Sequence, residues 1–259
     1  MTARKLSTAR IATRERIDPA EWEVRVDLAA CYRLAAHFRM TDLIYTHISA
    51  RVPGAKKHFL INAYGLLFDE ITAGNLVKVT LDGTIVDDAT GLGINPAGYV
   101  IHSAIHGARD DVACVMHTHT SAGLAVAAQR SGLLPLTQHA MRFADDLRYH
   151  DYEGIALDTD EQQRLVQDLG YANTMILRNH GLLVCGTSVL DAFDRMYYLE
   201  RACQAQVAAM SGGAALALPP PEVAAKVARQ FKRPGRTAPQ NAWNALRRML
   251  DRIDSSYKT

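Results

Sequence analysis

Residues 114–123 of the 259-residue chain read CVMHTHTSAG, a short apolar run that ends in two histidines one residue apart. Such a run predicts a buried β-strand. Side chains two apart on a strand point to the same face, so we expect His117 and His119 to lie together. Two ligands of one metal ion need this arrangement, but a pair of hydrogen-bonded histidines at a strand end would have it too. The spacing alone leaves both interpretations open.

An alternation of helices and short strands is predicted around this stretch from the period of the apolar residues and from Pro, Gly and Asp-Gly turn signals. The predicted helices are residues 20–38, 95–111, 121–132 and 188–210. The predicted strands lie in 46–54, 58–65, the hairpin 75–88, 112–119 and the pair 174–186. These elements predict one α/β domain over residues 19–210.

The two ends of the chain differ from this core in composition. Residues 1–18 are basic and lack the apolar core of a secretory signal, so we expect a flexible leader, with a transit peptide as the alternative. Gly, Ala and Pro mark residues 211–222 as a linker. Residues 223–259 form a basic amphipathic segment, which predicts a helical arm that docks on its own or a neighbouring subunit. One face of this arm carries Trp243, Leu246, Leu250 and Ile253.

Charge and cysteine content limit the partners of the chain. A formal net charge of +2 gives no electrostatic footprint for nucleic acid or a membrane surface. No apolar stretch approaches the roughly 20 residues that span a bilayer. The 4 cysteines are widely spaced, which favours buried thiols in a reducing compartment over a disulfide framework. We therefore expect a cytoplasmic protein with a small-molecule substrate, without a nucleic-acid or membrane partner.

His180 supplies a third imidazole in the stretch LRNHGLLVCG. The glycine after it permits a tight turn and a close approach of the backbone. Taken alone, a histidine in such a turn is more often structural. Together with His117 and His119, it would complete three nitrogen ligands and leave at least one coordination position open. That is the arrangement of a catalytic metal site.

Six segments of the chain resemble, in the same order, segments of the class II aldolase/adducin family. They are LIYTHISARVPG, NAYGLLFDEIT, AGYVIHSAIHGARDDVACVMHTHT, LPLTQHAMRF, YHDYEGIALD and MILRNHGLLVCG. The resemblance covers residues 25–210 and is closest to the branch that includes the adducin head domain. It implies a three-layer α/β/α sandwich around a mainly antiparallel central sheet, and a homotetramer. It also implies a divalent metal on His117, His119 and His180, zinc first, with iron or manganese as alternatives.

The chain departs from the aldolases of this family at positions that carry their chemistry. The family pattern has an acid/base Glu near the metal and Ser, Thr and Gly groups for a substrate phosphate. Alignment on His102 places Gly98 at the position of the Glu, and Tyr64, before Gly65, replaces a phosphate-binding Thr. His47 stands where the family often has Asn. A sugar phosphate is therefore a poor fit, while a metal could still polarise an oxygen of another small substrate.

Several residues remain as candidates for the site, each with a structural alternative. His102 could act as a base, support the metal site or be a surface-packed histidine. Tyr149 belongs to a polar-aromatic cluster, residues 149–152, that could simply close a strand end. Arg142 could pair with a substrate carboxylate or form an ordinary surface ion pair. The candidate catalytic residues are His102 and Tyr149. The candidate substrate contacts are His47, Gly65, Gly98 and Arg142.

These observations favour a metal-dependent, aldolase-like lyase. The expected reaction is carbon–carbon cleavage, by retro-aldol reaction or decarboxylation, of a small, oxygenated, non-phosphorylated substrate. An iron-dependent oxygenase on the same fold is one alternative, because imidazole suits iron as well as zinc. A catalytically silent, adducin-like oligomeric scaffold is the alternative from a different functional class.

Overall fold

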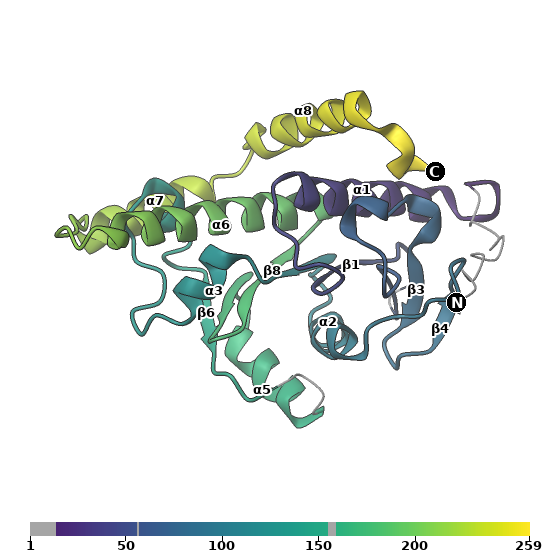
Figure 1. The fold of residues 1–259 in the computed structure, drawn as a ribbon, viewed down its shortest axis with the longest axis horizontal. Helices are drawn as coiled ribbons and strands as arrows, with labels where there is room; N and C mark the ends of the chain where they lie inside the picture. Colours follow the sequence, from purple (N-terminus) through teal and green to yellow (C-terminus); the bar gives the residue numbers. More distant parts are fainter. Residues whose placement is uncertain (1–13, 56, 155–158) are drawn as a thin grey trace, which may run out of the picture.

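The computed structural model describes residues 14–55, 57–154 and 159–259 (Figure 1). Within these residues, eight strands form one sheet in the order β4-β3-β2-β1-β5-β8-β7-β6. Neighbouring described strands are antiparallel, except that β6 and β7 are parallel. The strands are β1 (His47–Arg51), β2 (His58–Ile61), β3 (Val77–Thr80), β4 (Ile85–Asp87), β5 (Cys114–Thr118), β6 (Leu147–His150), β7 (Thr174–Leu177) and β8 (Gly181–Gly186).

Helices cover both faces of this sheet (Figure 1). They are α1 (Pro19–His37), α2 (Pro96–Ala108), α3 (Ser121–Ala127), α4 (Gln138–Met141), α5 (Thr159–Leu169), α6 (Val189–Ser211), α7 (Pro221–Phe231) and α8 (Ala238–Ile253). α1 and α6 pack on one face, and α2 and α5 pack on the other. The expected three-layer α/β/α sandwich around a mainly antiparallel sheet is therefore confirmed.

The central strand β5 is buried at every position, as its apolar sequence predicts. Its side chains alternate between two hydrophobic clusters, because successive residues of a strand point to opposite faces. Met116 belongs to the cluster under α1 and α6, whereas Val115 belongs to the cluster under α2 and α5. His117 follows Val115 by two residues and so lies on the α2 and α5 face. The period of the strand thus decides which layer receives the histidine pair.

The helix starts follow from local capping chemistry. Asp18 caps α1 by accepting a hydrogen bond from the backbone N–H of Ala20 at 2.8 Å, and Pro19 occupies the first helical turn. Asn95 caps α2 in the same way, again followed by a proline. The first turn of α2 lies next to the sheet, because Gly98 packs against the ring of His47 in β1. The predicted starts of both helices are confirmed.

The C-terminal segment folds back onto its own chain (Figure 1). α8 packs against α1 and α6, and this contact buries Trp243 and Leu250. The carbonyl oxygen of Thr259 accepts a hydrogen bond from the N–H of Gly74 at 2.8 Å. The apolar face of the arm is therefore covered mainly within the subunit, although Ile253 stays 61% exposed.

The predicted leader and linker flank the α/β core of the chain. Residues 1–13 of the predicted leader lie outside the described residues. In the predicted linker, α6 ends at Ser211 and α7 begins at Pro221. Among the described helices, none combines the length and the apolar composition that crossing a lipid bilayer requires.

Candidate metal centre

Two neighbouring strand ends bring the three histidines together. His117 lies near the end of β5 and His119 follows that strand, while His180 lies in the turn between β7 and β8. Gly181 permits this approach: a Cβ at this position would overlap the carbonyl oxygen of Thr118 and lie 3.1 Å from the ring of His119. The glycine after the third histidine is therefore required by the close packing of the turn against β5.

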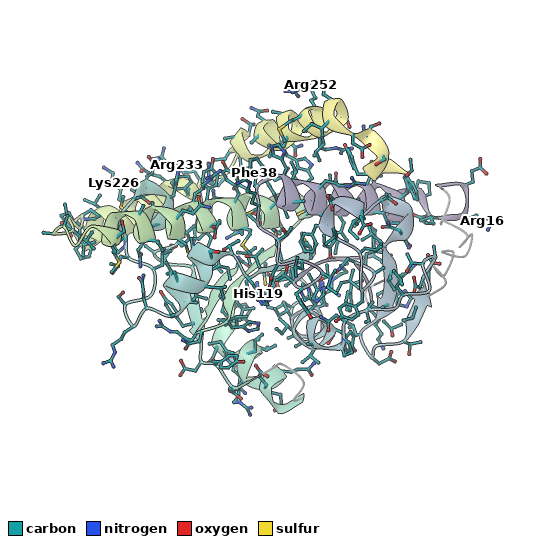
Figure 2. All side chains as sticks on the ribbon, in the orientation of Figure 1. Arg16, Phe38, His119, Lys226, Arg233 and Arg252 are labelled. Carbon is teal, nitrogen blue, oxygen red and sulfur yellow. The ribbon has the colours of Figure 1, made fainter. Side chains whose placement is uncertain are left out.

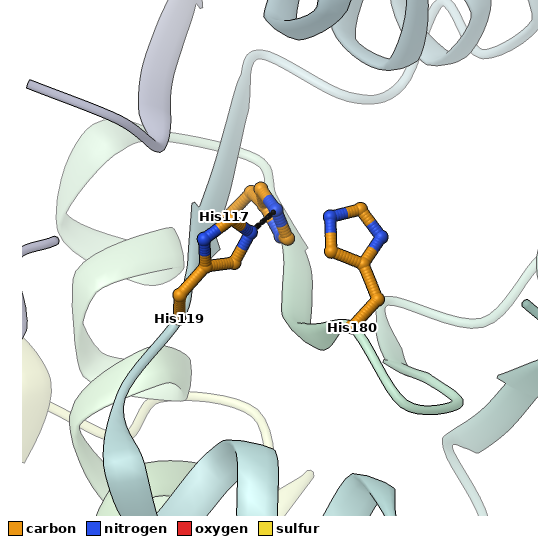
Figure 3. A group of neighbouring side chains, drawn as sticks. All are labelled: His117, His119 and His180. Atoms are coloured by element: carbon orange, nitrogen blue, oxygen red, sulfur yellow. Dashed lines mark hydrogen bonds between the residues drawn. The ribbon is translucent and has the colours of Figure 1, made fainter. Parts of the chain in front are cut away.

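The three imidazole rings face one another (Figure 3). The Nε2 atoms of His117 and His119 are 2.9 Å apart. The ring centroid of His180 lies 4.8 Å from that of His117 and 5.0 Å from that of His119. One ligand atom from each residue lies within 4.8 Å of the others. Figure 2 shows His119 near the middle of the molecule, below the α1 and α6 layer.

Hydrogen bonds on the far side of two rings fix their orientation. Nδ1 of His117 donates to the carbonyl oxygen of Leu182 at 2.9 Å, and Nδ1 of His119 donates to Oδ2 of Asp42 at 3.0 Å. Because a carbonyl and a carboxylate only accept, each Nδ1 carries the proton and each Nε2 presents a lone pair. Two lone pairs at this separation repel unless a cation or a proton lies between them. This donor set fits a divalent metal, with the outer hydrogen bonds that metal-bound histidines ordinarily make.

Burial favours the neutral form of His117 and His180. Desolvation lowers the pKa of His117 well below its usual value, and the neighbouring histidines lower it further. Desolvation also lowers the pKa of His180 to about 4. Metal ligation requires the neutral form, since a protonated nitrogen has no lone pair to give.

A cavity of about 400 Å³ opens beside the triad. Besides the three histidines, it is lined by Tyr45, Thr46, His47, Tyr64, Asn95, Ala97, Gly98, Ile101, Tyr152 and Gly154. These described lining residues include no Lys, Arg, Asp or Glu. The wall therefore offers hydroxyl, amide and ring groups, but neither a cation to neutralise a phosphate nor a carboxylate to move a proton.

His47 reaches this cavity because it lies directly opposite His117 in the pairing of β1 with β5. Its Nδ1 lies 2.9 Å from Oδ1 of Asn62, whose oxygen also accepts from the hydroxyl of Tyr32. The amide oxygen can only accept, so Nδ1 of His47 carries the proton and Nε2 is an acceptor. Burial lowers the pKa of His47 to about 4. Of the sequence candidates, His47 and Gly98 line the cavity.

The two candidate catalytic residues have other partners. His102 is fully buried, and its Nδ1 lies 2.6 Å from the hydroxyl of Ser49. The hydroxyl of Tyr149 accepts from the N–H of Leu133 at 3.0 Å, and its ring packs under Arg178. Neither lines the cavity. The contacts of Tyr149 are those of a closed strand end, which was its structural alternative. His102 is packed in the interior and not at the surface, where its structural alternative placed it.

Arg142 also lies away from the triad. Its guanidinium pairs with Asp194 and packs over the rings of Tyr198 and Phe231. The side chains of this pair are only 10% and 12% exposed, so it is a largely buried ion pair and not the surface pair that was the alternative. Arg142 does not line this cavity. Gly65 does not line the cavity itself. It has a positive φ of 105° in the turn directly after Tyr64, which does line the cavity.

Sequence reasoning did not single out three contributors to the site. Asp42 and Thr46 come from the loop before β1, and Asn62 directly follows β2. Thr46 and Asn62 lie in segments that resemble the family, but nothing in those segments indicated their contacts, and Asp42 lies outside all six segments. Tyr152, from the polar-aromatic cluster, lines the cavity with its ring centroid 6.1 Å from that of His180.

Comparisons with known proteins identify the family and agree with the fold. Residues 26–207 match the family described as Class II Aldolase and Adducin N-terminal domain. An aldolase II superfamily protein from Pseudomonas syringae has a crystal structure that is 60% identical and covers 96% of this chain and 100% of its own, with a TM-score of 0.92. L-fuculose 1-phosphate aldolase from Glaciozyma antarctica is 25% identical and covers 92% of this chain and 93% of its own, with a TM-score of 0.80.

Alpha-adducin from Mus musculus is 47% identical over 192 residues, which make up 73% of this chain and 26% of the adducin chain. The matched family range contains all three histidines of the triad. The resemblance that the sequence segments carried is confirmed. The chain belongs to the class II aldolase and adducin family.

Proposed function

We propose that the chain is a metal-dependent lyase that cleaves a carbon–carbon bond, by retro-aldol reaction or decarboxylation. Its substrate is small, oxygenated and not phosphorylated. The observation that carries the proposal is the convergence of His117, His119 and His180 on one wall of a cavity of about 400 Å³. The similarity to L-fuculose 1-phosphate aldolase supports this reaction class.

The three histidines would hold the metal. Three neutral imidazoles suit zinc and leave a coordination position for a substrate oxygen. A bound metal would supply Lewis-acid polarisation of that oxygen. Imidazole also suits iron, so the donor set leaves iron or manganese as alternatives.

The rest of the cavity would orient the substrate without charge. Tyr64 and Asn95 offer hydrogen-bonding groups, and the buried Oγ1 of Thr46 has no partner among the described residues. Such a polar atom is costly to bury unpaired, so a substrate hydroxyl that reaches it would be favoured. A phosphate dianion would find no cationic side chain in the described lining. This is the argument for a non-phosphorylated substrate.

His47 would accept the substrate proton at Nε2. Asn62 holds the ring through Nδ1, and the described lining offers no carboxylate for the same task. A positioned base typically contributes about 10²–10⁴-fold to a rate. This role moves from His102, which is bonded to Ser49 behind the cavity wall, to a histidine that lines the cavity.

The cellular setting and the assembly are part of the proposal. The cysteines of the described chain are buried and free, which fits the reducing cytoplasm. A homotetramer is expected from the family resemblance. The likeness to alpha-adducin supports the competing proposal of a catalytically silent scaffold, in which the triad would serve structure alone.

Metal analysis and a substrate screen test the proposal together. Full-length protein is purified without added metal, and its zinc, iron and manganese contents are measured. The protein loaded with each metal is then offered small keto acids and hydroxyketones, and product formation is followed by NMR. We expect a bound divalent metal and turnover that disappears in His119→Ala. Metal-loaded protein that turns over no member of the panel would favour the scaffold, and protein that binds no metal would refute the proposed chemistry.

A further inference from the structure

Asp42 contacts the metal centre from outside the cavity. Its Oδ2 accepts the hydrogen bond from Nδ1 of His119 at 3.0 Å, across a sequence separation of 77 residues. The side chain of Asp42 is 44% exposed, whereas that of His119 is 23% exposed. The carboxylate therefore lies at the protein surface and holds the ring from its outer side.

The loop that carries Asp42 has an unusual backbone. Arg39, Leu43 and Thr46 all have positive φ values, of 58°, 49° and 66°. Positive φ is uncommon outside glycine and is an outlier for a β-branched residue such as Thr46. The backbone N–H of Tyr45 donates to the carbonyl oxygen of Asp42 at 2.8 Å, which closes the loop into a tight turn.

Strained backbone persists only where its surroundings impose it, and such strain is typical of functional sites. Here the turn directs Asp42 to His119 on one side, while Tyr45 and Thr46 line the cavity on the other. The same short loop thus contributes to the metal centre and to the substrate wall.

The two anchored ligands are held by different kinds of acceptor. His117 donates to a neutral backbone carbonyl, that of Leu182, whereas His119 donates to a carboxylate. A charged acceptor makes the stronger hydrogen bond and increases the basicity of the opposite ring nitrogen. Asp42 accepts this hydrogen bond with its side chain, so a substitution can remove the bond. The backbone carbonyl of Leu182 cannot be removed in this way.

We propose that Asp42 is a positioning residue of the metal centre, which fixes the tautomer and orientation of His119 and thereby strengthens metal binding. This inference rests on the proposed function, because it requires that the triad binds a metal. Asp42 acts through His119 and does not itself touch the substrate.

Zinc affinity of the full-length protein tests the role of Asp42. The dissociation constant is measured by competition with a chromophoric chelator for wild type, Asp42→Ala and Asp42→Asn. Asp69→Asn, at an exposed carboxylate of the 3-10 helix Phe68–Glu70, is the matched control. We expect Asp42→Ala to weaken zinc binding by about 100-fold and Asp42→Asn by about 10-fold, because the amide oxygen can still accept the ring N–H. Asp69→Asn should match wild type.

The tautomer of His119 provides a readout that a purely structural role would not change. Nitrogen-15 NMR of the zinc-free protein should show the Nδ1–H form in wild type and a loss of this preference in Asp42→Ala. Zinc affinity and tautomer both equal to wild type in Asp42→Ala would overturn the inference and leave the proposed function standing. Wild-type protein that binds no zinc, iron or manganese would overturn both. If Asp42→Ala does not fold, Asp42→Asn decides, and an affinity equal to wild type would overturn the inference.

Discussion

His47 fills the space that a side chain at position 98 would need. A Cβ on Gly98 would overlap Cδ2 and Nε2 of the His47 ring and lie 2.8 Å from its Cγ. His47 begins β1 and Gly98 lies in the first turn of α2, so the contact joins the sheet to the helix at the cavity wall. The family resemblance implies a Glu at position 98 and often Asn at position 47, and the packing couples these two departures: the glycine makes room for the imidazole.

This packing predicts that Gly98→Ala destabilises the protein. Alanine in a helix is ordinarily favoured over glycine by about 0.5–1 kcal/mol. Here the added methyl would force the buried ring of His47 to move, so we expect a loss of about 1–3 kcal/mol. The free energy of unfolding is measured by urea denaturation.

In a His47→Ala background, Gly98→Ala should instead increase the free energy of unfolding, because the imidazole no longer fills the space. The double-mutant cycle isolates the contact between the two positions. Equal effects of Gly98→Ala in both backgrounds would show that the ring does not occupy this space in solution.

The metal centre predicts the effect of His119→Ala. We expect about one divalent metal per wild-type chain, and a loss of tight binding in the variant because two neutral nitrogens are too few. His139→Ala is the matched control, since His139 lies on α4 beside Tyr198 rather than at the triad. Metal content is measured by mass spectrometry after dialysis. Full occupancy in His119→Ala would refute the assignment of the ligands.

The layers of the fold and the histidine triad could be predicted from the sequence. The period of the residues around Val115 and His117 predicts which side chains of β5 share a face, and six ordered segments indicate the family. The glycine after His180 marks a close approach of the backbone. These are local properties or properties of segment order, which a sequence displays directly.

The partners of the site residues could not be predicted in this way. The sequence offered His102 as a base or a surface-packed histidine, but it is fully buried beside Ser49, a neighbour that the packing of α2 on β1 determines. Asp42 reaches His119 through a loop whose positive φ values fall on non-glycine residues, which no turn signal announces. A sequence pattern identifies which residues of a helix or strand share one face. It does not identify the residues of other elements that this face contacts.

Sugar phosphates should be poor substrates. The family resemblance implies hydroxyl groups for a phosphate at the positions where this chain has Tyr64, Pro96 and Ala97. The described cavity wall contains no cationic side chain. We expect no cleavage of L-fuculose 1-phosphate at ordinary enzyme rates, on the order of 1–10³ per second, by protein loaded with zinc. A coupled assay for the aldehyde product measures this. Cleavage at such rates would contradict the proposed substrate class.

The full-length protein should be a homo-oligomer, with a tetramer as the expected state. The sequence left open whether the arm docks on its own or a neighbouring subunit, and α8 packs on α1 and α6 of its own chain. Removal of residues 219–259 would therefore delete Trp243 and expose the part of the subunit's core that it covers. A truncated chain could lose assembly because it folds poorly, so truncation does not test assembly alone. Light scattering on the intact chain is the appropriate measurement. A monomer at micromolar concentration would contradict the expectation.

Mild acid should destabilise the fold through His106. Burial lowers the pKa of His106 to about 3 from the usual 6.5, and the nearby charge of Arg51 adds to this lowering. Its ring stacks on Phe59, and its Nε2 lies 2.8 Å from the hydroxyl of Ser49, which also contacts His102. Between pH 6.5 and 3 the unfolded chain binds a proton that the folded chain does not, so stability falls as pH falls.

Urea denaturation of metal-free protein between pH 4 and pH 7 measures this dependence. Below the pKa of the unfolded state, one such group should lower the free energy of unfolding by about 1.4 kcal/mol per pH unit. His106→Asn removes the titrating group, so its stability should fall less steeply with acid than that of wild type, by up to one proton's contribution. His139→Asn is the control, because His139 lies outside this buried cluster. Parallel curves for wild type and His106→Asn would mean that His106 takes up its proton while folded. In that protonated form Nε2 would donate its hydrogen bond to the hydroxyl of Ser49.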